Sequence, residues 1–354
     1  GWPTGGDPLL EGPPMLRPPL SPDEPCRLEA LRALHLVDTP LEASFERITR
    51  MAQRMLGMPI AALSLVEADR QWFKSIQGLD CEQTDRDVAF CAYTILGERP
   101  VVVPDARRDP RFAENPLVRG EPHIVSYAGA PLRAPGGLRI GSLCVIDTQP
   151  REFTPEDVEV LEDLAAVAEA EFESVLRRTR EGDVPAPTPE ERRRLIDSTT
   201  RLWNGEGVMR QAEASLVRAR ESLHGAVLGV VQIDNLEAIH AERGSSGRDE
   251  ALRVAARRVL GSAGEASVVG RLRGGRFIVL LNNISSAVEG GVRVASIGAS
   301  VRRLKISAQG REVRLAASTG FCYIDRGRSI DLRVALRIAE RGLTRPNAPT
   351  RRAS

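Results

Sequence analysis

The chain has 354 residues, 42% of them hydrophobic and 27% charged, and a formal net charge of +1. Its length predicts two or three domains, and its nearly balanced charge argues against binding to nucleic acid or to an anionic membrane. No apolar run approaches the roughly 18 residues of a membrane helix, and no secretory signal pattern opens the sequence, so we expect a cytoplasmic protein.

The five cysteines are scattered along the chain, at Cys26, Cys81, Cys91, Cys144 and Cys322. None lies in a CxxC pattern or in a Cys/His cluster with zinc spacing. We therefore expect free thiols, no metal site and no resident cofactor.

Residues 1–25 are rich in proline and glycine, which predicts a flexible lead without a core of its own. Residues 26–154 then combine helix-like and strand-like patterns of apolar residues. Amphipathic helices are predicted near residues 29–36 and 43–56, where apolar residues recur on one face. Strand-like runs follow, at residues 60–67, 72–78, 101–105, 126–132 and 139–147.

A long helix is predicted over residues 155–181. Thr154 is its expected cap, and Glu156 and Asp157 stand in the first turn, where the helix dipole favours acids. The apolar residues of this helix have partly heptad-like spacing, which fits either pairing with a second copy or packing on the preceding strands. Whether it pairs with a second copy or packs on the strands, we assign this helix to the C-terminal end of the first domain.

Residues 182–189 contain Gly182 and three prolines, which cannot continue a helix, so they are a predicted linker. The second domain is expected over residues 190–342. A basic tail, residues 343–354, is expected to be disordered.

Three phrases follow one another in the first domain: FCAYTIL, VVVPDARRDPRFAENPLV and RIGSLCVIDTQPREFTPEDVEVLEDLA. With the sequence around them, from residue 27 to residue 177, they resemble a GAF sensor domain. The resemblance implies a central antiparallel sheet with helices on one side and a ligand cavity on the other.

The residues expected near that cavity are Phe90, Cys91, Tyr127 and Cys144. Their alternative interpretation is ordinary core packing. Cys91 could act as a redox sensor, although a buried free cysteine is usually inert. The sequence identifies no GAF ligand, and an empty cavity is an open alternative.

The second domain contains the phrases DSTTRLWNGEG, RLRGGRFIVLL and ALRIAERG. They resemble the diguanylate cyclase (GGDEF) family, whose corresponding phrases read close to D-x-LTGLxNR, RLGGDEFAVLL and ALYxAKxxG. The resemblance implies a ferredoxin-like core with a mixed sheet. The whole chain is then a two-domain protein of the α+β and α/β classes.

The signature hairpin has lost its acids. The positions that correspond to GGDEF are Arg273, Gly274, Gly275, Arg276 and Phe277. The first metal-binding Asp of the family corresponds to Gln232. Magnesium prefers carboxylate oxygens, so the resemblance implies that the metal has lost its ligands.

Further departures from the family residues occur at positions that bind the nucleotide. Lysines of the family correspond to Glu237 and to the phosphate-binding position Glu340, and the guanine-binding Asn corresponds to His240. Reversing charges within about 4 Å of a phosphate would cost on the order of several kcal/mol of binding. Asn204, Asp234 and Asp249 retain family residue types, and the alternative for Asn204 and Asp249 is a turn or helix-start role.

Two more expectations concern the same domain. The product-inhibition motif RxxD corresponds to Gly264 and Ser267, so inhibition by a cyclic dinucleotide is not expected. The exchanged signs suggest that Arg276 pairs with Glu237 across the vacated site, unless both are separate surface charges.

These observations favour a signalling, dimerisation or scaffolding module without catalysis. Two alternatives remain: a domain that binds GTP as an allosteric ligand without turnover, and an active diguanylate cyclase that uses other metal ligands. We expect a homodimer formed through the first domain and its C-terminal helix, a protein partner, and no contact with nucleic acid or membrane.

Overall fold

The structure is a computed structural model that describes residues 15–180, 188–218, 224–264, 267–308, 311–326 and 330–344. The chain divides into two compact units, residues 1–189 and 190–354. Most of the expected lead, linker and tail lies outside the described residues. Part of the lead is ordered, because the hydroxyl of Tyr93 donates to the carbonyl of Leu16 at 2.7 Å and a helix begins at Glu24.

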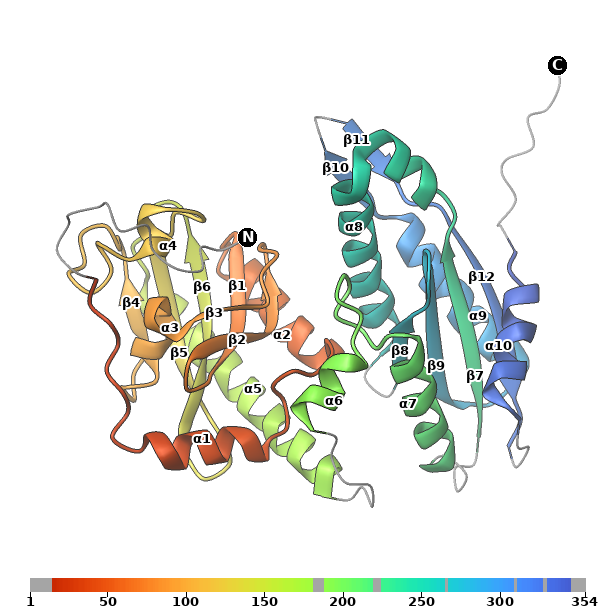
Figure 1. Ribbon diagram of the computed structural model, residues 1–354, viewed down its shortest axis with the longest axis horizontal. Helices are drawn as coiled ribbons and strands as arrows, with labels where there is room; N and C mark the ends of the chain where they lie inside the picture. The colour runs from red at the N-terminus through yellow and green to blue at the C-terminus, as the bar shows by residue number, and fades with distance from the viewer. Residues whose placement is uncertain are drawn as a thin grey trace. The chain divides into compact units, whose positions relative to one another are not determined.

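The first unit is built on a six-stranded antiparallel sheet with the order β3-β2-β1-β6-β5-β4 (Figure 1). The strands are β1 (Ile60–Val66), β2 (Arg70–Gln77), β3 (Gln83–Asp85), β4 (Val101–Val103), β5 (Ser126–Arg133) and β6 (Arg139–Asp147). The helices are α1 (Glu24–Ala33), α2 (Ala43–Met55), α3 (Phe90–Thr94), α4 (Pro116–Arg119) and α5 (Pro155–Arg180), with a 3-10 turn η1 (Arg86–Val88).

Both faces of this sheet are covered, so its central strand β1 is buried throughout. Alternate residues of a strand point to opposite faces. Leu63 and Leu65 pack with Phe45 of α2 and Phe172 of α5 in one core. Ala62 and its even-numbered neighbours pack in a second core with α3 and the loops. The antiparallel sheet that the sequence predicts is thus present.

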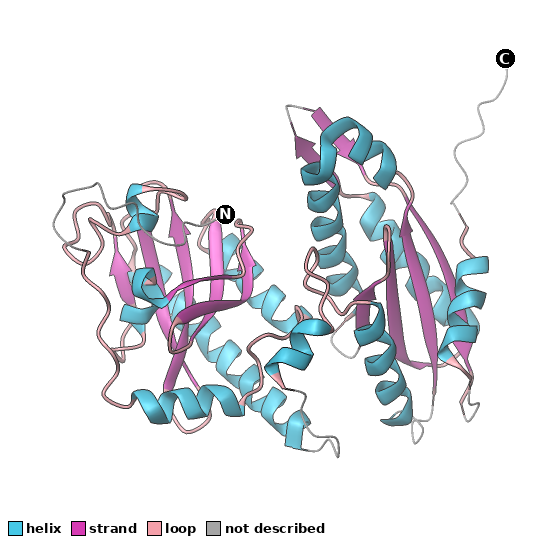
Figure 2. Ribbon diagram, in the orientation of Figure 1, coloured by secondary structure: helices cyan, strands magenta, loops and turns pink. Residues whose placement is uncertain are grey.

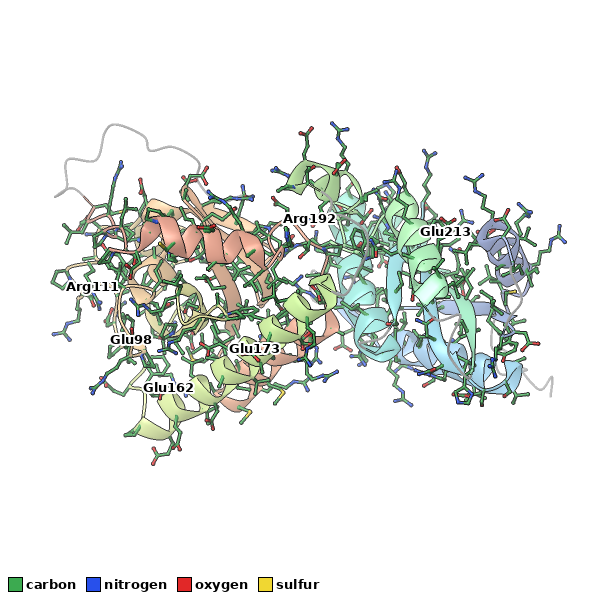
Figure 3. All side chains as sticks on the ribbon, turned by 90° about the horizontal axis from the view of Figure 1, so that it is seen from below. Glu98, Arg111, Glu162, Glu173, Arg192 and Glu213 are labelled. Carbon is green, nitrogen blue, oxygen red and sulfur yellow. The ribbon has the colours of Figure 1, made fainter. Side chains whose placement is uncertain are left out.

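Helix α5 begins where the sequence predicts. The Thr154 hydroxyl accepts from the backbone N–H of Asp157 at 3.1 Å, and the Asp157 carboxylate accepts from the N–H of Thr154 at 3.1 Å. This reciprocal cap satisfies two backbone donors. The inner face of the helix, including Phe172, is buried in the core, whereas Glu162 and Glu173 are exposed (Figure 3).

The second unit is built on a four-stranded sheet with the order β12-β7-β9-β8 (Figure 1), and Figure 2 shows helices beside these strands. Its strands are β7 (Gly225–Ile233), β8 (Val268–Arg271), β9 (Arg276–Ile284) and β12 (Ala317–Ile324), and a separate hairpin joins β10 (Lys305–Ala308) to β11 (Arg311–Arg314). The helices are α6 (Pro189–Arg194), α7 (Gly205–Arg218), α8 (Leu236–Ala263), α9 (Ala287–Arg302) and α10 (Leu332–Arg341).

Helices cover both faces of this second sheet. Residues of α7 and α10 share a buried cluster with β7, β9 and β12. On the opposite face α9 lies close to β7, because a Cβ at Gly229 would be 2.7 Å from Val294. The sequence predicted a mixed sheet, but the strand pairs of this sheet are antiparallel. Among the described residues, a parallel pairing occurs in the isolated bridge between Trp203 and Gly270.

In the part of the chain that is described, no helix is both long enough and apolar enough to cross a membrane.

Candidate functional site

The signature residues form the tip of the β8–β9 hairpin. Gly274 has φ +73°, a left-handed conformation that glycine adopts at little cost. Arg273 and Gly274 are exposed, while Gly275 is buried. A Cβ at Gly275 would lie 3.1 Å from Cβ of Ile233 and from Cδ2 of Leu236. The hairpin tip therefore leaves little room for a side chain at the third signature position.

The end of β7 brings further predicted residues to this tip. Gln232 is opposite Arg276 in the β7–β9 register, and the N–H of Ile233 donates to the carbonyl of Gly275 at 2.8 Å. A hollow of about 320 Å³ is lined by Gln232, Ile233, Asp234, Leu236, Glu237, Arg273, Gly274, Gly275 and Arg276. The sequence thus identified most of the residues that line this hollow.

The partner of Arg276 differs from the prediction. Nη1 of Arg276 lies 2.6 Å from Oε1 of Glu340 on α10, whereas Glu237 is exposed on the first turn of α8. The pairing of Arg276 with Glu237 was therefore wrong. Helix α10 packs against β12 and β7, which brings its last turn to the start of β9. Both residues of the pair stand at positions where the resemblance to the family implies a reversed charge.

Asp234 is the remaining acid at the end of β7, and it is engaged in the fold. Its carboxylate accepts from the hydroxyl of Ser318 at 2.7 Å, and its backbone N–H donates to the carbonyl of Ala316 at 2.9 Å. The neighbouring Gln232 offers a neutral amide, which donates to the carbonyl of Ile233 at 3.2 Å. This end of the strand presents one carboxylate, already hydrogen-bonded.

The donor set at the hairpin does not fit magnesium. Gly275 has no side chain, Arg276 is a cation and Gln232 is an amide, whereas a hard divalent cation is held by carboxylates. Within the described ranges, no three His, Cys, Asp or Glu side chains gather in a way that could hold a metal ion. No chemical step through a bound metal follows from these residues.

A second hollow, of about 720 Å³, shares Arg273 and Gly274 of the hairpin tip with the first. Its lining residues are Asp197, Asn204, Gly205, Glu206, Arg248, Arg271, Leu272, Arg273 and Gly274. The guanidinium of Arg271 contacts both oxygens of Asp197 at 3.0 and 2.9 Å. Sequence reasoning did not single out Arg271, although it opens the signature phrase.

Asn204 has a structural role, as its alternative interpretation stated. Its carbonyl oxygen accepts from the N–H of Gly207 at 2.9 Å, and its amide donates to the carbonyl of Arg194 at 2.7 Å. It therefore caps α7 and ties that helix to α6.

His240, at the position of the guanine-binding Asn, and Asp249, which retains a family residue type, both lie on α8. His240 precedes and Asp249 follows a kink at Gly244, where φ is +66°. Both side chains are half-buried, and the Nδ1 atom of His240 is buried without a hydrogen-bond partner. Neither residue is among those that line the two hollows at the hairpin.

The positions of the product-inhibition motif form a turn. Gly264 ends α8 with φ +91°, and the hydroxyl of Ser267 donates to the Gly264 carbonyl at 2.5 Å. Neither position supplies a charged side chain to a ligand.

The four residues expected at the GAF cavity do come together. The ring centroids of Phe90 and Tyr127 are 5.2 Å apart, and the Sγ atoms of Cys91 and Cys144 are 3.6 Å apart. The sequence missed Phe112, whose ring stacks on Phe90 at 4.0 Å. Phe112 lies in a loop, where the spacing of apolar residues follows no helix or strand pattern that could have identified it.

Comparisons with known proteins agree with both resemblances. The family model described as "GAF domain" matches residues 40–172, and the model described as "Diguanylate cyclase, GGDEF domain" matches residues 194–351.

Two curated proteins are similar to parts of the chain. Cyclic di-GMP phosphodiesterase PA2567 of Pseudomonas aeruginosa is 44% identical over 172 residues, which is 48% of this chain and 29% of that protein. Diguanylate cyclase DgcP of Escherichia coli is 24% identical over 164 residues, 45% of this chain and 47% of that protein. The chain thus spans less than half the length of each relative.

Among solved structures, a sensory box/GGDEF family protein from Caulobacter crescentus matches with a TM-score of 0.39 and 19% identity, over 42% of this chain and 95% of that one. The diguanylate cyclase SiaD of Pseudomonas aeruginosa, solved with its activator SiaC, matches with a TM-score of 0.40 and 18% identity, over 53% of this chain and 68% of that one. On the two family matches, this chain joins a GAF domain to a GGDEF domain.

Proposed function

We propose that this chain is a signalling protein of the cyclic di-GMP pathway, in which a GAF sensor is coupled to a GGDEF domain that does not make cyclic di-GMP. The link to the pathway is supported by the two curated relatives, one a cyclic di-GMP phosphodiesterase and the other a diguanylate cyclase. The GGDEF domain then acts as a binding, dimerisation or scaffolding module.

The Arg276–Glu340 ion pair is the observation that carries the loss of catalysis. Phosphoryl transfer depends on cations that neutralise the charge of the phosphates. Arg276 occupies a position where the family has a metal-binding acid, and Glu340 occupies the position of a phosphate-binding lysine. Because the two neutralise each other, neither is available to a metal or to a triphosphate.

Product analysis tests this proposal. We expect the purified chain, incubated with GTP and either magnesium or manganese, to yield no cyclic di-GMP by anion-exchange chromatography, while an active cyclase in the same buffer does. Cyclic di-GMP formed by the chain above the level of a heat-treated sample would refute the proposal and favour the alternative of an active cyclase.

Binding of GTP without turnover is the second candidate, and one observation favours it. The larger hollow presents Arg248 and Arg273, and guanidinium groups bind phosphate without a metal. Arg271 also lines it but is paired with Asp197. Calorimetric titration with GTP, with and without magnesium, separates the candidates. Heat of binding that does not depend on magnesium supports this candidate, and no heat supports the scaffolding module.

We also propose that the protein is cytoplasmic and that the GAF domain and α5 form a homodimer. Val167 on α5 is 54% exposed, although Leu161, Leu164 and Phe172 of the same helix are buried. Light scattering after size exclusion should give the mass of a dimer for the full chain, and replacing Val167 by Glu should shift that mass toward the monomer. A monomeric wild-type chain at micromolar concentration would contradict this assembly.

A further inference from the structure

Two cysteine sulfur atoms meet in the core of the GAF domain. Cys91 lies on α3 and Cys144 on β6, 53 residues apart in the sequence, and their Sγ atoms are 3.6 Å apart. Both side chains are buried, with 2% and 0% of their surface exposed. The proposed function makes no use of this pair.

Hydroxyl groups surround the pair. The hydroxyl of Tyr127 donates to Sγ of Cys91 at 3.5 Å. That hydroxyl is in turn held by Oγ1 of Thr94 at 2.7 Å and by Oγ of Ser142 at 3.4 Å. Such donors stabilise a thiolate within an apolar core, because each can hydrogen-bond to the negative sulfur.

The backbone leaves space for this arrangement. Gly129 is directly opposite Cys144 in the β5–β6 register, and a Cβ there would lie 2.1 Å from the Tyr127 hydroxyl oxygen and 2.8 Å from Oγ of Ser142. Glycine at this position therefore lets the Tyr127 hydroxyl reach the sulfur atoms.

The two thiols differ in acidity. Burial raises the pKa of Cys91, but hydrogen bonds from Cys144, Ser64, Tyr127 and Ser142 together lower it to about 7. The pKa of Cys144 is raised, because its hydrogen bond with Cys91 and its burial both favour the protonated thiol. Cys91 is thus the more acidic thiol of the pair and ionises before Cys144.

We propose that Cys91 and Cys144 form a thiol pair that a small hydroperoxide oxidises to a disulfide within the GAF domain. The Cys91 thiolate attacks one peroxide oxygen, the O–O bond breaks, and the departing hydroxide takes a proton and leaves as water. Cys91 is then a sulfenic acid. The sulfur of Cys144 attacks the sulfur of Cys91, the S–O bond breaks, and the hydroxide leaves as water with the Cys144 proton. Two thiols and one hydrogen peroxide give one disulfide and two waters.

The closing movement is small. A disulfide needs sulfur atoms about 2.05 Å apart, so the pair has to approach by about 1.5 Å. Cys91 is on α3, which has 5 residues and no side-chain cap. A one-turn helix without a cap opens more readily than a strand in the middle of a sheet, and such opening also admits a small uncharged peroxide.

The test uses the full chain treated with hydrogen peroxide, blocked with N-ethylmaleimide, digested without reduction and analysed by mass spectrometry. We expect one linked peptide pair that contains Cys91 and Cys144, and the loss of two free thiols per chain. Cys322 is the internal control. Burial raises its pKa, so it should stay reduced during the peroxide treatment and then be alkylated by N-ethylmaleimide. Wild-type protein in which Cys91 and Cys144 stay free while the exposed Cys26 is oxidised would overturn the proposal.

Variants test whether Cys91 is the thiolate that reacts with peroxide and Cys144 the thiol that closes the disulfide. In Cys144→Ser, Cys91 should stop at the sulfenic acid, which dimedone traps. In Cys91→Ser, Cys144 should not react with dimedone. Tyr127→Phe removes the hydroxyl donor and keeps the ring, and oxidation should become roughly tenfold slower, as expected for one lost hydrogen bond to a charged sulfur. An unchanged oxidation rate in a folded Tyr127→Phe protein, or dimedone on Cys144 in Cys91→Ser, would contradict the assigned mechanism.

Discussion

Arg276 at the start of β9 and Glu340 in the last turn of α10 form an ion pair with a separation of 2.6 Å. Their side chains are 38% and 29% exposed, so solvent screens the pair and limits its contribution to roughly 0–1 kcal/mol. The resemblance to the cyclase family implies an acid and a lysine at the corresponding positions, so the polarity of the pair bears on the proposed loss of catalysis. On the proposed function, the exchange keeps an ion pair between two elements and removes the groups that would bind metal and phosphate.

A charge-reversal cycle tests the pair directly. Arg276→Glu places two carboxylates together and Glu340→Lys two cations, so each variant should lose up to about 1 kcal/mol of unfolding free energy. The double variant restores opposite charges and should regain most of the loss. Urea denaturation of the four proteins measures the coupling. Additive losses in the double variant would mean that the two side chains do not interact in solution.

Restoring the signature acids should not restore catalysis. The variant with Gly275→Asp and Arg276→Glu should yield no cyclic di-GMP, because Gln232, Glu237 and Glu340 would still be unsuited to metal and phosphates. The new side chain at Gly275 would also be crowded, with its Cβ 3.1 Å from Cβ of Ile233. Chromatography of GTP reactions is the measurement. Turnover in this variant would show that the remaining positions do not block the reaction.

Arg271 should matter more for stability than its neighbour Arg273. Arg271 and Asp197 are 10% and 20% exposed, and Nη1 of Arg271 donates to both carboxylate oxygens of Asp197, which ties the hairpin to the turn before α7. Arg271→Ala should cost about 1–3 kcal/mol, because it removes a charged partner of a partly buried carboxylate that keeps its hydrogen bonds from Thr200. Arg273→Ala is the matched control at an exposed position and should stay within about 0.5 kcal/mol of wild type. Equal losses in urea denaturation would refute the anchoring role.

The sequence predicted local features better than distant contacts. The cap at Thr154 and the course of α5 follow from periodicity and from the residues of the first turn, which act within a few positions of each other. The partner of Arg276 could not be read in this way, because Glu340 is 64 residues away and reaches the hairpin through the packing of α10. The contact between Cys91 and Cys144 likewise depends on how a short helix lies on a sheet. Residue types led to the proposal that the metal site is lost, whereas the ion pair between Arg276 and Glu340 could be identified only from the folded chain.

The last prediction concerns the attachment of α1 to the GAF sheet. Glu24 on α1 contacts Arg27 at 2.5 Å and Arg86 at 2.5 Å, and those arginines are 1% and 4% exposed. Burial opposes ionisation of Glu24, but the hydrogen bonds from Arg86 and Arg27 prevail and lower its pKa from 4.5 to about 2.

Because the pKa of Glu24 is lower in the folded state, its contribution is fully present above pH 4.5 and is lost as the pH falls toward about 2. Allowing for solvent screening, that contribution is about 1–2 kcal/mol. Glu24→Gln should therefore be less stable than wild type at pH 7, and the difference should shrink as the pH falls from 4.5 to 2. Thermal or urea unfolding across this range measures it. A difference that stays constant with pH would mean that packing of the side chain, and not its charge, holds α1 in place.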